Sequence, residues 1–125
     1  MLKLEDRVRL QHMLDHACEA VGLLRERSRA DLDSDRLRQL ALTRLIEVVG
    51  EAATRVSGET QVRLPQIPWG QVVSMRNRLI HGYASVDLDI LYQTVVQDLP
   101  VLVAELQPLL RPSPPPASGI GPVGD

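Results

Sequence analysis

The sequence predicts an all-α protein, an up-and-down bundle of four main helices, and three observations lead to that class. The chain has 125 residues, close to the commonest size of a single domain. Apolar residues make up 44% of it, yet Phe is absent and aromatic residues reach only 2%, so the core must be aliphatic. Leu, Val, Ile and Ala recur at helical spacing over long windows, whereas β-proteins rely on aromatic and Thr-rich strands. An all-β fold is therefore excluded.

The first two helices are predicted by periodicity and by a polar break between them. From residue 4 to about residue 29, apolar positions recur at alternating spacings of four and three. A break rich in N-cap residues follows at 31–35, and residues 36–57 then run without Pro. The second helix has too many apolar positions for one narrow stripe, so we expect it either to lie centrally in the bundle or to meet another subunit.

The second half of the chain is predicted to hold a linker, two helices and a tail. Residues 58–68 are rich in helix breakers, and Pro68 suits the first turn of a third helix that runs to His81. Asp87 is the expected N-cap of the fourth helix, in which Pro100 predicts a kink near Val96. We expect residues 1–110 to form the domain and residues 111–125, rich in Pro and Gly, to form a disordered tail.

Composition and charge restrict the classes of function. The single cysteine, Cys18, excludes a disulfide framework and a cysteine-built zinc site. No charged-then-apolar leader follows Met1, and no apolar run approaches the roughly 20 residues of a membrane span, so we expect a cytoplasmic protein. The net charge of −2 argues against a protein that coats nucleic acid, but residues 60–86 contain no Asp or Glu. That segment is locally cationic.

The residues best equipped for chemistry lie together in this cationic segment. Arg76, Asn77, His81 and Tyr83 fall within eight residues, and Asn77 and His81 share the polar side of the predicted third helix. Arg76 is expected within the apolar arc of that helix, where it needs a carboxylate partner or a second copy of the chain. The structural alternative is a helix-end histidine and an arginine in an ordinary ion pair.

These residue types can cleave RNA without a metal or cofactor. An imidazole can take a proton from the ribose 2′-OH or protonate the leaving 5′-oxygen, while a guanidinium stabilises the charged transition state. One histidine supplies only one of the two proton transfers. A two-fold homodimer that brings both copies of His81 to one cleft would supply both.

The order of these residues resembles the signature of the HEPN ribonucleases, in particular HepT-like toxins: an Arg, four residues, a His, one residue and a Tyr. Arg76, His81 and Tyr83 fill the three named positions. The resemblance extends from about residue 4 to residue 110, and it includes the segments Ile46–Ala53, Ile67–Trp69 and Asp98–Pro100.

This resemblance implies an all-helical homodimer in which Arg76 and His81 form the catalytic pair and Asn77 positions the phosphate or the histidine. Tyr83 would accept AMP from a partner nucleotidyltransferase of the MntA type that serves as antitoxin. A bulky anionic adduct two residues from His81 would then block an RNA cleft.

Other polar clusters have simpler interpretations. His12 and His16 stand four residues apart, but no third metal ligand is evident, which favours solvent-facing histidines. Arg44, Glu47, Glu51 and Arg55 have the spacing of a surface ion-pair ladder, with the alternative that Glu47 or Glu51 holds Arg76. Arg78 is a further possible supporting residue. Trp69 is expected to anchor the helix entry, and Tyr92 to be a packing residue.

The leading hypothesis is a metal-independent endoribonuclease that acts as the toxin of a toxin–antitoxin pair. One alternative is a helical dimer that serves only as binding partner or substrate of the nucleotidyltransferase. Another is a plain helical oligomerisation domain, which requires the motif to be a coincidence.

Overall fold

The computed structural model describes residues 2–81 and 85–110, apart from the side chain of His81. The expected tail, residues 111–125, lies outside the described residues. The elements in chain order are α1 (Leu4–Leu23), α2 (Arg29–Asp33), α3 (Arg36–Thr54), α4 (Gly58–Arg63), α5 (Trp69–Leu79), β1 (Ile80–His81), β2 (Ser85–Val86), α6 (Leu88–Gln93), the π-helical turn η1 (Thr94–Asp98) and α7 (Leu99–Leu110).

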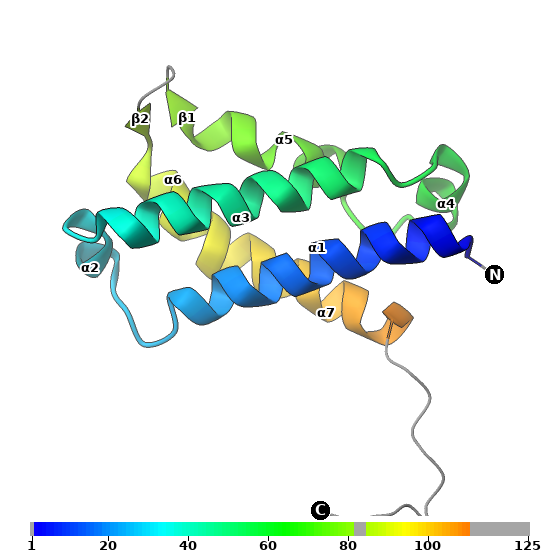
Figure 1. Ribbon diagram of the computed structural model, residues 1–125, viewed down its shortest axis with the longest axis horizontal. Coiled ribbons are helices and arrows are strands. Elements are labelled where there is room, and N and C mark those ends of the chain that lie inside the picture. Colours follow the sequence, from blue (N-terminus) through cyan, green and yellow to red (C-terminus); the bar gives the residue numbers. More distant parts are fainter. Residues whose placement is uncertain (1, 82–84, 111–125) are drawn as a thin grey trace, which may run out of the picture.

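The all-α up-and-down bundle is confirmed. Its four main helices are α1, α3, α5 and the continuous run from α6 through η1 to α7, and each runs antiparallel to the one before it (Figure 1). The helix α3 lies between α1 and α5, while α7 packs on the other side of α1. The central position expected for the second helix is therefore the observed one, and the aliphatic core forms around it.

The outer face of α3 nevertheless stays open. Near its start, Leu37 is 81% exposed and Leu40 is 51% exposed. Further along, Arg44 and Glu51 are exposed on the same helix. The groove between α3 and α5 lies along this exposed face.

Two short helices were not predicted. Residues 58–68 were expected to be a linker, but Ser57 caps α4 by accepting a hydrogen bond from the backbone N–H of Thr60. The helix α2 begins with a capping box between Ser28 and Asp31. As a consequence the first helix ends at Leu23 rather than near residue 29, and α3 ends at Thr54 rather than at residue 57.

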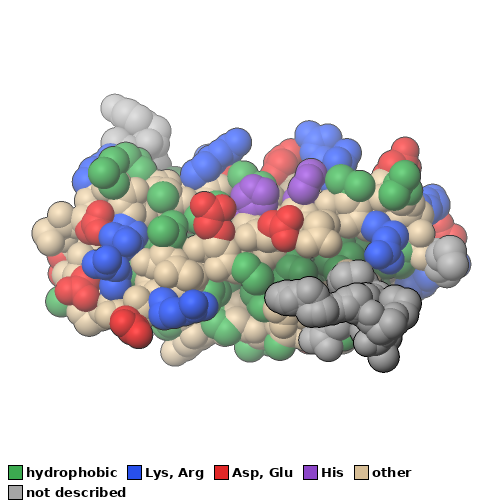
Figure 2. Space-filling model, turned by 60° about the horizontal axis from the view of Figure 1, so that its bottom comes forward, with side chains coloured by type: hydrophobic (Ala, Val, Ile, Leu, Met, Phe, Trp, Pro, Cys, Tyr) green, Lys and Arg blue, Asp and Glu red, His purple; other side chains and the backbone are tan. Residues whose placement is uncertain are grey.

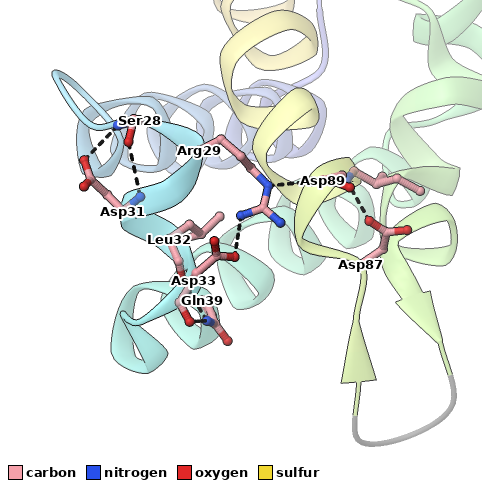
Figure 3. A network of polar contacts seen from close by, with 9 residues as sticks. Ser28, Arg29, Asp31, Leu32, Asp33, Gln39, Asp87 and Asp89 are labelled. Carbon is pink, nitrogen blue, oxygen red and sulfur yellow. Dashed lines mark hydrogen bonds and ion pairs between the residues drawn. The ribbon is translucent and has the colours of Figure 1, made fainter.

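A network of polar contacts joins α2 to the start of α6 (Figure 3). The Nε of Arg29 donates to Asp89 at 2.7 Å, and its Nη1 donates to Asp33 at 2.8 Å. Asp87 caps α6 as expected by accepting from the backbone N–H of Ile90. These contacts fix the point at which the chain leaves β2.

The third predicted helix ends two residues early. It was expected to continue to His81, but α5 ends at Leu79 because Ile80 takes an extended backbone and pairs with Val86. The backbone N–H of Asp87 also donates to the carbonyl of Leu79 at 2.7 Å. A short antiparallel hairpin thus follows α5 directly.

A kink was expected near Val96, and the structure has the π-helical turn η1, residues Thr94–Asp98, at this place in the last helix. Pro100 has no N–H to donate to Val96 and its ring would clash with that carbonyl, so the regular α-helical pattern gives way one turn earlier. Tyr92 packs against the core just before this turn, as predicted.

Candidate active site

A surface cavity of about 360 Å³ lies between α3 and α5. Its lining consists of four side chains and Gly50 from α3 and three residues from α5. The cavity is lined by Arg44, Glu47, Gly50, Glu51, Thr54, Val73, Arg76 and Asn77. It therefore brings together Arg76 and Asn77 of the motif with both glutamates that were considered as supports.

Arg76 is held at this cavity by Glu47. Its Nε donates to Oε2 of Glu47 at 2.7 Å, and Arg44 donates from Nη1 to Oε1 of the same carboxylate at 3.1 Å. Sequence periodicity placed Arg76 within the apolar arc, but its side chain is 48% exposed. The long side chain reaches over the edge of α5 to α3, so Val72, Met75 and Leu79 form the buried face without it.

Glu47 is the better protected partner of this pair, with 32% of its side chain exposed. The hydrogen bond from Arg76, followed by that from Arg44, lowers the pKa of Glu47, although partial burial opposes the shift. The carboxylate consequently stays ionised at neutral pH and offers a fixed anion to both guanidinium groups.

Gly50 is a residue of this site that sequence reasoning did not single out for a role. It is buried in α3, and a Cβ built on it would meet the carbonyl oxygens of Val72 at 3.3 Å and Val73 at 3.4 Å. The missing side chain lets α5 approach α3 closely one turn from Glu47. A glycine inside an apolar helical run was the available signal.

The remaining candidate residues take different places. Glu51 lines the cavity but pairs with Arg55 at 3.2 Å, so the ion-pair ladder along α3 and the contact with Arg76 coexist. Arg78 lies outside the cavity lining, and its Nη2 is 3.8 Å from Asp98. Asn77 is exposed, and its side chain makes no hydrogen bond to the described part of the chain.

His81 and Tyr83 follow this cavity along the chain. The backbone of His81 lies in β1 opposite Ser85, which places it two residues beyond the end of α5. The side chain of His81 and the whole of Tyr83 lie outside the described residues. A second cavity, of about 570 Å³, lies where the hairpin meets α3, lined in part by Leu40, Ile80 and Val86.

The other predicted clusters behave as surface and packing features. His12 is exposed, and Nδ1 of His16 lies 2.7 Å from the carbonyl oxygen of His12. Within residues 2–81 and 85–110, no group of three or more His, Cys, Asp or Glu is placed to hold a metal ion. The indole N–H of Trp69 donates to the carbonyl of Leu64 at 3.0 Å, which confirms this residue as an anchor at the start of α5. No helix among the described residues is long and apolar enough to cross a membrane.

Comparison with known proteins decides the family. The profile of the ribonuclease HepT-like family matches residues 13–109. The chain belongs to the ribonuclease HepT-like family. The match covers every residue that lines the cavity between α3 and α5 and both ends of the hairpin, so the HepT-like resemblance seen in the motif extends over the whole bundle from α3 onward.

Individual HepT-like relatives agree with this assignment. A protein of Thermococcus cleftensis named "Probable ribonuclease HepT" is 34% identical over 102 residues, which cover 78% of this chain and 93% of the relative. A protein of Methanocaldococcus jannaschii named "Putative RNase" is 25% identical over 107 residues, covering 86% of this chain and 98% of the relative. A third, from Caldanaerobacter subterraneus, is also named "Putative RNase" and is 27% identical over 102 residues, 82% of this chain and 91% of the relative. No solved structure matches the chain.

Proposed function

We propose that this protein is a metal-independent endoribonuclease, the toxin of a toxin–antitoxin pair. The observation that carries the proposal is the placement of Arg76 and Asn77 at one cavity, with Glu47 fixing the arginine and His81 five residues beyond it in the chain. Membership of the HepT-like family and the ribonuclease names of three relatives support it.

The proposed reaction is transfer of the RNA phosphate from the 5′-oxygen to the neighbouring 2′-oxygen. The 2′-OH loses its proton and attacks phosphorus, the bond to the 5′-oxygen breaks, and that oxygen gains a proton. His81 acts as the general base or the general acid of these steps. The products are an RNA with a 2′,3′-cyclic phosphate and an RNA with a free 5′-OH.

Arg76 is the proposed stabiliser of the negative charge on phosphorus. Toward the described residues it donates only from Nε, which leaves the N–H groups of both terminal nitrogens for phosphate oxygens. Asn77 adds an amide that is free to donate to the same group. Because Glu47 already orients the guanidinium, little reorganisation is needed when RNA binds.

A homodimer completes the proposed site, since one His81 per chain provides one of the two proton transfers. The start of α3, where Leu37 and Leu40 are exposed, is an available surface for the second copy. A solution mass equal to a single chain at micromolar concentration would contradict this part of the proposal.

Tyr83 is the proposed control point. A nucleotidyltransferase antitoxin of the MntA type would transfer AMP to its phenolic oxygen, and the added negative charge would repel RNA from His81. Coexpression with that antitoxin should add AMP to Tyr83 and abolish toxicity, whereas Tyr83→Phe should escape because it keeps the ring and lacks the acceptor oxygen. Full neutralisation of Tyr83→Phe, with no adduct on the parent protein, would instead indicate inhibition by complex formation.

The activity itself is tested with purified protein, a mixed RNA substrate and EDTA. We expect cleavage to continue in EDTA and to yield cyclic phosphate ends. If toxicity and AMP transfer are found but RNA stays intact, the chain is a non-catalytic partner of the nucleotidyltransferase and the proposal is wrong.

A further inference from the structure

We propose that a strip of arginines across α3 binds the phosphates of single-stranded RNA beyond the cleaved bond. This arginine strip consists of Arg76 in α5, Arg44 in α3, Arg55 directly after the end of α3, and Arg9 in α1. The inference rests on the proposed function, because it extends the RNA site from the Arg76 cavity toward α1.

The strip is formed by two adjoining cavities. Beside the 360 Å³ cavity that holds Arg76 lies a third cavity, of about 230 Å³, between α3 and α1, lined in part by Arg9, His12 and Arg55. Arg44 and Glu51 line both cavities, so the two are continuous across the exposed face of α3. A chain that leaves Arg76 along this face meets Arg44 and then Arg55 and Arg9.

The strip carries an excess of positive charge within an acidic chain. The linings of the two cavities contain four arginines against two carboxylates, Glu47 and Glu51. Glu47 is shared by Arg76 and Arg44, and Glu51 pairs with Arg55. Arg9 has no ion pair with any described residue, so no carboxylate within residues 2–81 and 85–110 neutralises its charge. Since the whole chain has a net charge of −2, this local excess is the feature that attracts a polyanion.

The exposure of these side chains suits contact with phosphates. Arg44 is 73% exposed and Arg55 is 59% exposed, so both guanidinium groups can keep their glutamate contacts and still donate outward. Figure 2 shows the neighbouring face, where two histidine side chains lie side by side with both cationic and acidic side chains around them. The imidazole of His12, which lines the 230 Å³ cavity, offers a further polar group.

The length of the strip defines the expected ligand. Arg44 lies in α3 and Arg55 is the C-cap residue of that helix, eleven residues further on, which corresponds to about 16 Å at 1.5 Å per residue. An RNA strand that rises 3.4 Å or more per nucleotide would place up to about five nucleotides along that distance. The lining of the strip contains no Phe, Tyr or Trp, so the contacts are mainly with the phosphate backbone and carry little base preference.

The test uses the full chain with His81→Ala, so that RNA is bound without being cut. Fluorescence anisotropy gives the Kd for a labelled 12-nucleotide unstructured RNA and for a trinucleotide, at several salt concentrations. The strip variants are Arg9→Gln and Arg55→Gln. The matched control is Arg7→Gln, which makes the same charge change on the helix that carries Arg9, at an exposed residue that lines neither cavity.

We expect each strip variant to weaken binding of the 12-nucleotide RNA by about three- to tenfold and to reduce the salt slope by roughly 0.7 per lost phosphate contact. Binding of the trinucleotide should stay unchanged, and Arg7→Gln should match the parent. Equal Kd values for Arg9→Gln and Arg7→Gln, with Arg55→Gln also unchanged, would overturn the inference.

Because the assay measures binding, its outcome is separate from that of the proposed cleavage. The parent chain could fail to cut RNA while the strip variants still bind the 12-nucleotide RNA more weakly than Arg7→Gln does. That result would contradict the ribonuclease proposal and support the RNA-binding strip. If RNA is cut but the 12-nucleotide RNA binds no better than the trinucleotide, the strip is wrong and the catalytic site stands.

Discussion

Arg76 and Glu47 join α5 to α3 through a 2.7 Å hydrogen bond between residues 29 positions apart in the chain. The pair lies at the edge of the cavity in which Asn77 is also exposed. Arg44 binds the other oxygen of Glu47, so the carboxylate acts as a fixed point for two guanidinium groups. In the proposed mechanism this makes Glu47 a positioning residue that acts through Arg76.

Glu47→Gln is predicted to lower kcat for RNA cleavage by roughly tenfold to a hundredfold, because Arg76 loses its charged partner and its orientation. Glu47→Asp should restore part of the rate, since the charge returns on a shorter side chain. Single-turnover cleavage rates provide the measurement.

The matched control for this prediction is Glu51→Gln, which removes a carboxylate one turn away that pairs with Arg55. It should keep kcat within about twofold of the parent, a difference that corresponds to well under 1 kcal/mol. If Glu47→Gln and Glu51→Gln lowered kcat equally, Glu47 would contribute only a negative charge to this surface and would not orient Arg76.

Gly50→Ala is predicted to lower the free energy of unfolding by about 1 kcal/mol and to reduce RNA cleavage as well. The added Cβ would press on the backbone of α5 at Val72 and Val73, and such overpacking outweighs the gain in helix propensity. Urea denaturation and cleavage rates measure the two effects.

Gly22 of α1 provides the comparison, because a Cβ at that exposed position has no atom within 4 Å. Gly22→Ala should raise the free energy of unfolding by up to about 1 kcal/mol and leave cleavage unchanged. If Gly50→Ala stabilises the protein as much as Gly22→Ala does, the close approach of α3 and α5 is not a constraint.

Asp6→Ala is predicted to cost about 3 kcal/mol at pH 7. The Asp6 side chain is 3% exposed and accepts hydrogen bonds from the backbone N–H of Ser57 at 3.0 Å, from its hydroxyl at 2.7 Å and from the hydroxyl of Thr60. Removing it leaves these donors without a buried acceptor. Asp15→Ala, at an exposed carboxylate on the same helix, should change stability by less than about 0.5 kcal/mol.

The stabilisation by Asp6 should depend on pH in a defined direction. Hydrogen bonds from Thr60 and then Ser57 lower the pKa of Asp6 in the folded chain below its value in the unfolded chain. Its contribution is therefore fully present above the unfolded pKa, about 3.9, and is lost as the pH falls through the folded pKa. The difference in unfolding free energy between parent and Asp6→Ala should narrow below about pH 4, and a difference that widens on acidification would contradict this assignment.

Sequence patterns predicted the long helices because each buries one continuous apolar stripe that periodicity can detect. The helices α2 and α4, five and six residues long, are too short to display a period, and their signals were the caps Ser28 and Ser57. The end of α5 was missed because the apolar Ile80 continues the helical pattern, although its backbone pairs with Val86.

The sequence predicted most of the charged and polar residues of the site, but it predicted their arrangement in space only in part. The spacing of the motif identified Arg76 and Asn77, and the ladder on α3 identified both glutamates. Spacing alone could not choose between Glu47 and Glu51, because that choice depends on how α5 crosses α3. Because Gly50 has no side chain, α5 can approach α3 closely, and no pattern of polar residues reveals this contact.

The central claim is tested most directly by the rate at which purified protein cleaves a defined RNA in EDTA, measured for the parent, Arg76→Ala, His81→Ala and the exposed control Arg7→Ala. The account predicts that the parent and Arg7→Ala cut at similar rates and leave 2′,3′-cyclic phosphate ends, while Arg76→Ala and His81→Ala each lose at least roughly a hundredfold. Equal rates in all four proteins, or a parent that cuts only with added divalent metal, would contradict it.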